Sequence, residues 1–168
     1  MTDMIERKSD PYNAEPTPGA LIERFLTPQA LFYVRSHGAV PDLPADHRIE
    51  VSGTGMASRS FSVEELKSAL ATRTVTAVLQ CAGNRRTDLQ QVAKTSGDPW
   101  DVGAIGNAEW TGVRLSDVLD AVGAPNASDL FVAFTGADEV DVEGEEALFA
   151  VSYTHLRAHE TPEHLVCR

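Results

Sequence analysis

The stretch from Thr74 to Gln80 (TVTAVLQ) constrains the fold most, because it is apolar over most of its length and rich in β-branched residues. Such a run favours a strand that is covered on both faces. It leads directly to Cys81, and the following residues, AGNRR, form a turn with two cations. The sequence therefore predicts a buried strand that presents a thiol and two guanidinium groups at its carboxyl end.

The rest of the chain mixes short strands with short helices. Ser62, followed three residues later by Glu65, is a capping box that opens a helix to about residue 70. Ser116 is the expected cap of a helix over 117–122, which ends at Gly123. Further elements are a helix over 20–26, a β-prone run over 31–34, and strands over 48–51, 109–114 and 130–134. Without a regular βαβ alternation, the pattern predicts an α+β fold with mixed sheets and short helices.

Charge and composition exclude several classes of protein. The 14 Lys and Arg residues against 25 Asp and Glu residues give a net charge of −11, which argues against nucleic-acid or membrane partners.

A length of 168 residues corresponds to one domain, and two cysteines cannot make a disulfide framework. No secretory signal or spanning apolar run occurs, so we expect a cytoplasmic protein, with a periplasmic one as the alternative if an upstream signal is missing from this sequence. Residues 1–19 contain four Pro or Gly residues and are expected to form an extended N-terminal arm.

Cys81 is the residue with the clearest chemistry. A thiolate binds soft metals or attacks electrophiles, and the adjacent Arg85 and Arg86 favour that form and offer donors to an oxyanion. Arg35 and His37 form a second cationic cluster. Two other interpretations stay open at this point. Cys81 is either a small buried core residue or, paired with His37, the nucleophile of a hydrolase, although no triad order supports the latter.

The final segment, residues 152–168 (SYTHLRAHETPEHLVCR), differs from the rest of the chain. His155 and His159 have the i, i+4 spacing of metal ligands on a helix, with His164 and two glutamates nearby. Pro162 interrupts such a helix, however, and no metal-binding motif is complete. The segment also resembles translated adapter sequence at the ends of spurious reading frames, so we interpret it as a non-native tail and expect native sequence to stop near residue 151.

Three motifs taken together resemble the sulfite oxidase family of molybdenum enzymes. They are FLTPQALFYVRSHGAVP, VTAVLQCAGNRR and WDVGAIGNAEWTGVRLSDVL, in that order. PYNAEP before them and FVAFTGADEVD after them fit the same family, so the resemblance covers roughly residues 10–151. Assimilatory nitrate reductases share the cysteine motif, but the third motif favours the sulfite oxidases.

The resemblance assigns roles to individual residues. It implies that Cys81 is the thiolate ligand of molybdenum in a molybdenum–molybdopterin cofactor. Arg35 and Arg86 match the arginines that bind the oxyanion substrate, and Trp100 matches an aromatic wall of that pocket. The cofactor contacts that it implies are Arg35, Ser36, His37 and Asp138.

The implied activity is oxidation of sulfite to sulfate by oxygen-atom transfer. The alternatives are a nitrate reductase, another oxyanion or sulfoxide enzyme, and a non-catalytic cofactor-binding or interaction module. No haem-attachment motif is present, so the resemblance implies an external electron acceptor, a cytochrome or oxygen. Because the family continues past this sequence, we expect residues 20–151 to be an incomplete molybdopterin-binding domain, itself inactive, of a protein that is homodimeric at full length.

Overall fold

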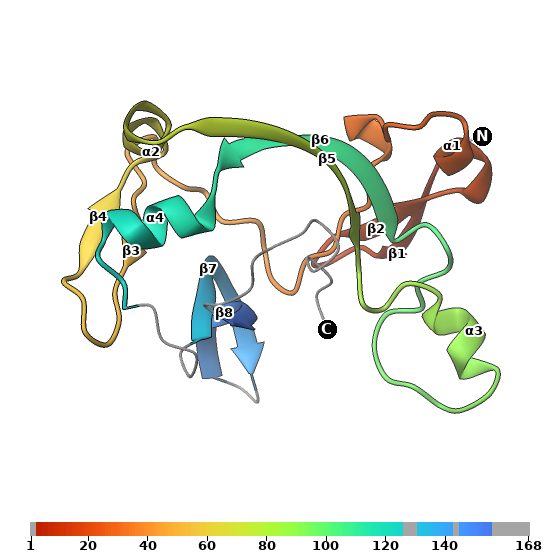
Figure 1. The fold of residues 1–168 in the computed structure, drawn as a ribbon. Coiled ribbons are helices and arrows are strands. Elements are labelled where there is room, and N and C mark those ends of the chain that lie inside the picture. Colours follow the sequence, from red (N-terminus) through yellow and green to blue (C-terminus); the bar gives the residue numbers. More distant parts are fainter. Residues whose placement is uncertain (1–2, 126–130, 143–144, 156–168) are drawn as a thin grey trace.

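The computed structural model describes residues 3–125, 131–142 and 145–155 and shows four antiparallel strand pairs with short helices (Figure 1). The pairs are β1 (Met4–Lys8) with β2 (Asn13–Pro16), β3 (Ile49–Val51) with β4 (Arg59–Phe61), β5 (Thr72–Gln80) with β6 (Ile105–Val113), and β7 (Phe131–Val142) with β8 (Glu145–His155). The helices are α1 (Pro18–Ile22), α2 (Val63–Ala69), α3 (Arg86–Gln90), α4 (Leu115–Ala121) and the 3₁₀ turn η1 (Gln29–Leu31). Small antiparallel sheets with a few short helices confirm the predicted α+β class.

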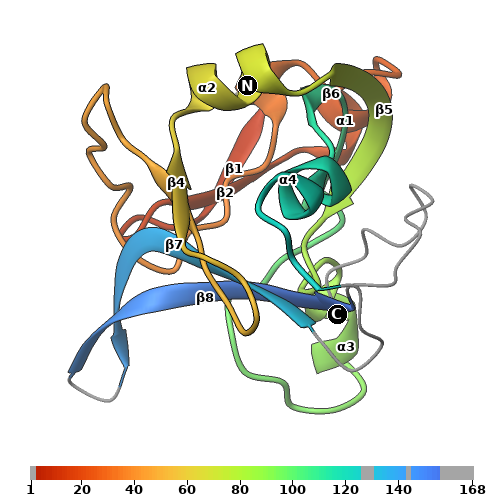
Figure 2. The same ribbon diagram turned by 60° about the vertical axis from the view of Figure 1, so that its left-hand side comes forward.

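The β5–β6 strand pair runs along the length of the molecule. It arches from α2 to the β1–β2 hairpin and α3, and Figure 2 shows the same curve from another side. Its register runs from Thr72 opposite Val113 to Gln80 opposite Ile105. The predicted strand is therefore present, but its predicted burial is wrong. Its apolar residues remain solvent-accessible, since Val75 is 43% and Val78 is 52% exposed.

The small core lies where β2 meets the segment before β6. All four residues of β2 are buried, although the sequence predicts an extended arm there. Trp100 and Ala104 are also fully buried. A Cβ at Gly103 would collide with the backbone carbonyl of Pro16, so the two segments approach closely only because residue 103 is glycine. This packing positions the turn after β5, where the candidate site lies.

Local signals locate α2 and α4, whereas the helix predicted over 20–26 ends at Ile22 and α3 forms within the predicted turn. The Ser62–Glu65 capping box opens α2, and Gly123 follows α4 with a positive φ of 70°. The predicted cap at Ser116 is wrong, because α4 begins at Leu115 after Arg114. The β-prone run over 31–34 does not form a strand, because its first residue, Leu31, ends η1 and Val34 makes only a single bridge with Ala14.

None of the helices in the described part of the chain is long and apolar enough to cross a membrane. The histidines and glutamates of the final segment beyond residue 155 lie outside the described residues, so the interpretation of that segment stays a prediction.

Candidate functional site

The turn after β5 places the Cys81 thiol in a half-buried position. The Gly83 N–H donates to Sγ across 3.3 Å, and the Asn84 N–H donates to the Cys81 carbonyl across 3.0 Å. The Cys81 N–H in turn donates to the Ala104 carbonyl across 2.9 Å. Backbone hydrogen bonds therefore fix the direction in which the thiol points.

Segment 100–104 packs against this turn. The Ala104 N–H donates to Asn84 Oδ1 (3.1 Å), the Arg85 N–H donates to the Asp101 carbonyl (2.7 Å), and the Thr87 N–H donates to the Trp100 carbonyl (3.0 Å). Trp100 is 0% exposed, and its indole Nε1 has no hydrogen-bond partner among the described residues. A buried indole N–H normally has a partner, so the Trp100 N–H is an exception in the described part of the chain.

Arg86 extends from the first residue of α3 and is held by two glycines and a backbone carbonyl. Its Nη1 donates to the Asp98 carbonyl across 2.8 Å. A Cβ at Gly83 would lie 2.6 Å from Nη2, and one at Gly97 would lie 2.7 Å from Nη1. The guanidinium group therefore packs directly on the backbone next to Cys81, which only glycines allow.

Arg35 approaches Asp98 from the other side. Its Nη1 lies 3.8 Å from the carboxylate Oδ2 of Asp98, and both side chains are about one-quarter exposed. The same guanidinium group donates to the Ser36 carbonyl (2.6 Å) and lies 3.3 Å from His37 Nδ1. The structure thus joins Arg35 to Arg86 through a single residue, Asp98.

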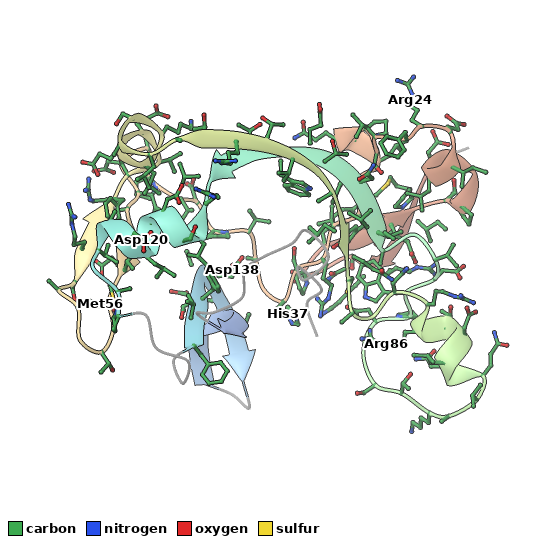
Figure 3. The ribbon with its side chains drawn as sticks, viewed as in Figure 1. Arg24, His37, Met56, Arg86, Asp120 and Asp138 are labelled. Carbon is green, nitrogen blue, oxygen red and sulfur yellow. The ribbon has the colours of Figure 1, made fainter. Side chains whose placement is uncertain are left out.

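The charges of this cluster shift the pKa of His37. Desolvation lowers its pKa below the ordinary value of 6.5, and the Arg35 cation lowers that pKa further, whereas Asp98 and Asp138 oppose both effects. Figure 3 shows His37 between Asp138, on β7, and Arg86. A Cβ at Gly38 would meet the backbone of Glu139, so this loop lies directly against β7. The predicted residues Arg35, Ser36, His37 and Asp138 are therefore neighbours.

The sequence alone missed the buried polar residues that support the site. Asn13, which is 0% exposed, accepts the Ser36 N–H at 2.8 Å and donates to the Ser36 carbonyl at 3.0 Å. The Glu15 carboxylate, also 0% exposed, accepts the N–H groups of Asp101 and Gly103, each at 2.7 Å, and the Nε–H of Arg7 at 2.5 Å. Both residues belong to the motif PYNAEP, which contributes to the family resemblance but has no local pattern that assigns them a role.

Arg85 has a different position from its neighbour. Its Nε donates to Asp88 across 2.7 Å, and its side chain is 66% exposed. Within the described ranges, no three His, Cys, Asp or Glu side chains gather into a metal site.

Comparison with known proteins identifies the family. The chain matches the oxidoreductase molybdopterin binding domain over residues 37–165. It is 44% identical to the sulfite oxidase of Gallus gallus over 138 residues, which is 82% of this chain and 29% of that protein. It is 43% identical to the mitochondrial sulfite oxidase of Drosophila melanogaster over 129 residues, 76% of this chain and 22% of that protein. A nitrate reductase [NADPH] of Phytophthora infestans is 39% identical over 133 residues, 77% of this chain and 15% of that protein.

Two statements follow from these matches. The chain spans less than a third of the length of each of these relatives. The expectation of a cytoplasmic location is contradicted, because the Drosophila relative is a mitochondrial enzyme by name, and this points away from the cytoplasm. With its profile matched over most of the sequence, the chain belongs to the oxidoreductase molybdopterin binding domain family.

Proposed function

We propose that the protein containing this chain oxidises sulfite to sulfate by oxygen-atom transfer, at a molybdenum–molybdopterin cofactor whose metal is bound by Cys81. The proposal is carried by one observation, the continuous set of contacts that joins the Cys81 thiol to two arginines. Gly83 bonds to Sγ and packs on Arg86, and Asp98 links Arg86 to Arg35. A soft sulfur donor beside two fixed cations suits a metal that acts on an oxyanion.

The residues present fit such a cofactor. Cys81 offers one half-buried thiol whose direction is fixed, and Trp100 offers a buried N–H without a partner in the described structure. We assign cofactor contacts to Arg35, Ser36 and His37, which the loop at Gly38 brings against β7, and to Asp138 on β7 itself. When bound, the cofactor supplies the oxygen-atom and two-electron chemistry.

The protein's own groups bind and orient the substrate. Arg35 and Arg86 present guanidinium donors that hold a dianion despite the net charge of −11. The Arg86 bond to a backbone carbonyl and its packing on two glycines reduce the freedom that it loses when it binds an anion. We assign Trp100 as the aromatic wall that excludes water from this side of the site.

A nitrate reductase is the second candidate, because a relative of that name matches most of this chain. The cysteine turn and the two arginines suit nitrate as well, since both substrates are oxyanions.

We further propose an external electron acceptor, a cytochrome or oxygen, and a homodimeric full-length protein. We assign residues 20–151 to part of the molybdopterin-binding domain and residues 152–168 to a non-native tail. Sequencing the gene across codon 152 tests this boundary, because a native reading frame that continues through residues 152–168 would contradict it.

The test uses the full-length protein that contains these residues, expressed in a host that makes the cofactor. We expect bound molybdenum by elemental analysis and sulfite-dependent reduction of ferricyanide or cytochrome, both lost in Cys81→Ser. Ser68→Ala, an exposed substitution on α2, is the control and should retain both. Activity that survives in Cys81→Ser would refute the assignment, and nitrate-dependent oxidation of a reduced viologen without sulfite oxidation would favour the second candidate.

A further inference from the structure

Asp98 stands out because it contacts both arginines of the candidate site through different groups. Its backbone carbonyl accepts hydrogen bonds from Arg86 Nη1 (2.8 Å) and from the Trp100 N–H (2.9 Å). Its carboxylate lies 3.8 Å from Arg35 Nη1. The carbonyl is part of the backbone and cannot be removed by substitution, whereas the carboxylate can. The two roles of this residue are therefore separable by experiment.

The carboxylate lies where it competes with an anion for Arg35. At 3.8 Å the two groups form an ion pair, and both side chains keep about a quarter of their surface exposed, 25% for Arg35 and 23% for Asp98. An oxyanion that approaches Arg35 therefore meets a negative charge already beside the cation. Repulsion between like charges is proportional to the product of the charges, so a dianion is repelled about twice as strongly as a monoanion.

The neighbouring groups support this placement. The pKa of His37 responds to Arg35 and to Asp98 with opposite signs, which shows that these three side chains share one electrostatic environment. The Arg35 guanidinium group also donates to two neutral acceptors, the Ser36 carbonyl and Asn13 Oδ1, and lies beside the His37 ring. Asp98 therefore supplies the carboxylate of the ion pair that the structure gives Arg35.

We infer that Asp98 is a specificity-determining residue of the anion site, whose carboxylate weakens the binding of oxyanions at Arg35 and weakens that of dianions more than that of monoanions. The inference rests on the proposed assignment of Arg35 as an oxyanion-binding residue. It does not depend on the identity of the substrate, because any oxyanion reports the charge at position 98.

The experiment measures binding of inorganic sulfate and of nitrate by isothermal titration calorimetry at pH 8, at fixed ionic strength. The proteins are the full-length wild type and its Asp98→Asn, Asp98→Glu and Asp117→Asn variants. Asp117 is the matched control, because its side chain is 22% exposed and pairs with Arg114 at 3.1 Å on α4. For the loss of a partly exposed charge we expect Asp98→Asn to bind nitrate about twofold and sulfate about fourfold more tightly.

The other variants separate charge from structure. Asp98→Glu keeps the charge and should stay close to the wild type, as should Asp117→Asn, and Arg35→Ala added to Asp98→Asn should abolish the gain. Equal gains for sulfate and nitrate, or no gain, would overturn the inference. A gain in sulfate affinity in a protein that lacks sulfite oxidation would uphold Asp98 and reject the proposed function. A lower KM for sulfite at unchanged kcat would support both.

Discussion

Replacing Glu15 by glutamine removes the charge from the centre of the core and should destabilise the protein strongly. The carboxylate is 0% exposed and accepts three hydrogen bonds, from Arg7 and from the N–H groups of Asp101 and Gly103. Glutamine keeps one acceptor oxygen and turns an NH₂ group toward a donor. Breaking a buried ion pair by removing one partner costs about 3–5 kcal/mol of stability, and leaving a buried N–H without an acceptor also lowers the stability.

The free energy of unfolding is measured by urea denaturation. With a slope of about 2 kcal/mol per M of urea, the expected loss lowers the midpoint by about 2 M. Glu64→Gln is the control, because Glu64 forms a similar bond with Lys67 (2.9 Å) on α2 while its side chain is 83% exposed. That substitution should change the stability by less than about 0.5 kcal/mol.

A second measurement tests whether Glu15 also holds the site in place. The segment that it binds ends at Ala104, whose carbonyl accepts the Cys81 N–H. The rate at which Ellman's reagent modifies Cys81, identified as the reaction that is lost in Cys81→Ser, should rise in Glu15→Gln, under conditions where the protein is still folded. If both the urea midpoint and the thiol reactivity match those of Glu64→Gln, the role assigned to Glu15 is refuted.

Three further changes have defined outcomes. Gly83→Ala should displace the guanidinium group of Arg86, whose flexible end would lie 2.6 Å from the new Cβ. Sulfate binding measured by calorimetry should weaken by about tenfold, with little loss of stability. An unchanged affinity would contradict the role of Arg86. The pKa of His37 is lowered by burial first and by Arg35 second, so the folded state binds fewer protons than the unfolded chain at pH values near that pKa. The protein should therefore lose stability as the pH falls from above 6.5 through the lowered pKa. In a plot of the urea midpoint against pH, His37→Gln should reduce the slope in this range, and an identical slope in the variant would argue against the assignment. Ser62→Ala breaks the capping box of α2 and should cost about 1 kcal/mol in thermal unfolding followed by circular dichroism, while Ser68→Ala on the same helix costs less.

Part of the site could be predicted from the sequence because its signals are local. Cys81 follows directly on a β-branched run, and Arg86 lies five residues further on, at the start of α3. The residues that connect and support them could not be predicted. Asp98 and Glu15 carry no local pattern, and their partners are distant in sequence, since Glu15 binds the N–H of Gly103. The burial of β5 was predicted wrongly because a run of apolar residues indicates a strand but not what covers it.

By itself, the sequence determined the elements whose hydrogen bonds close within a few residues, such as the capped start of α2 and the stop at Gly123. It also determined the family, through motifs that are continuous in the chain. Only the tertiary structure decided which polar groups are buried and which charges meet. Asn13 and Glu15 lie in the core because segments far along the chain bring the matching donors and acceptors, and without those partners the cost of burying them would keep both residues at the surface.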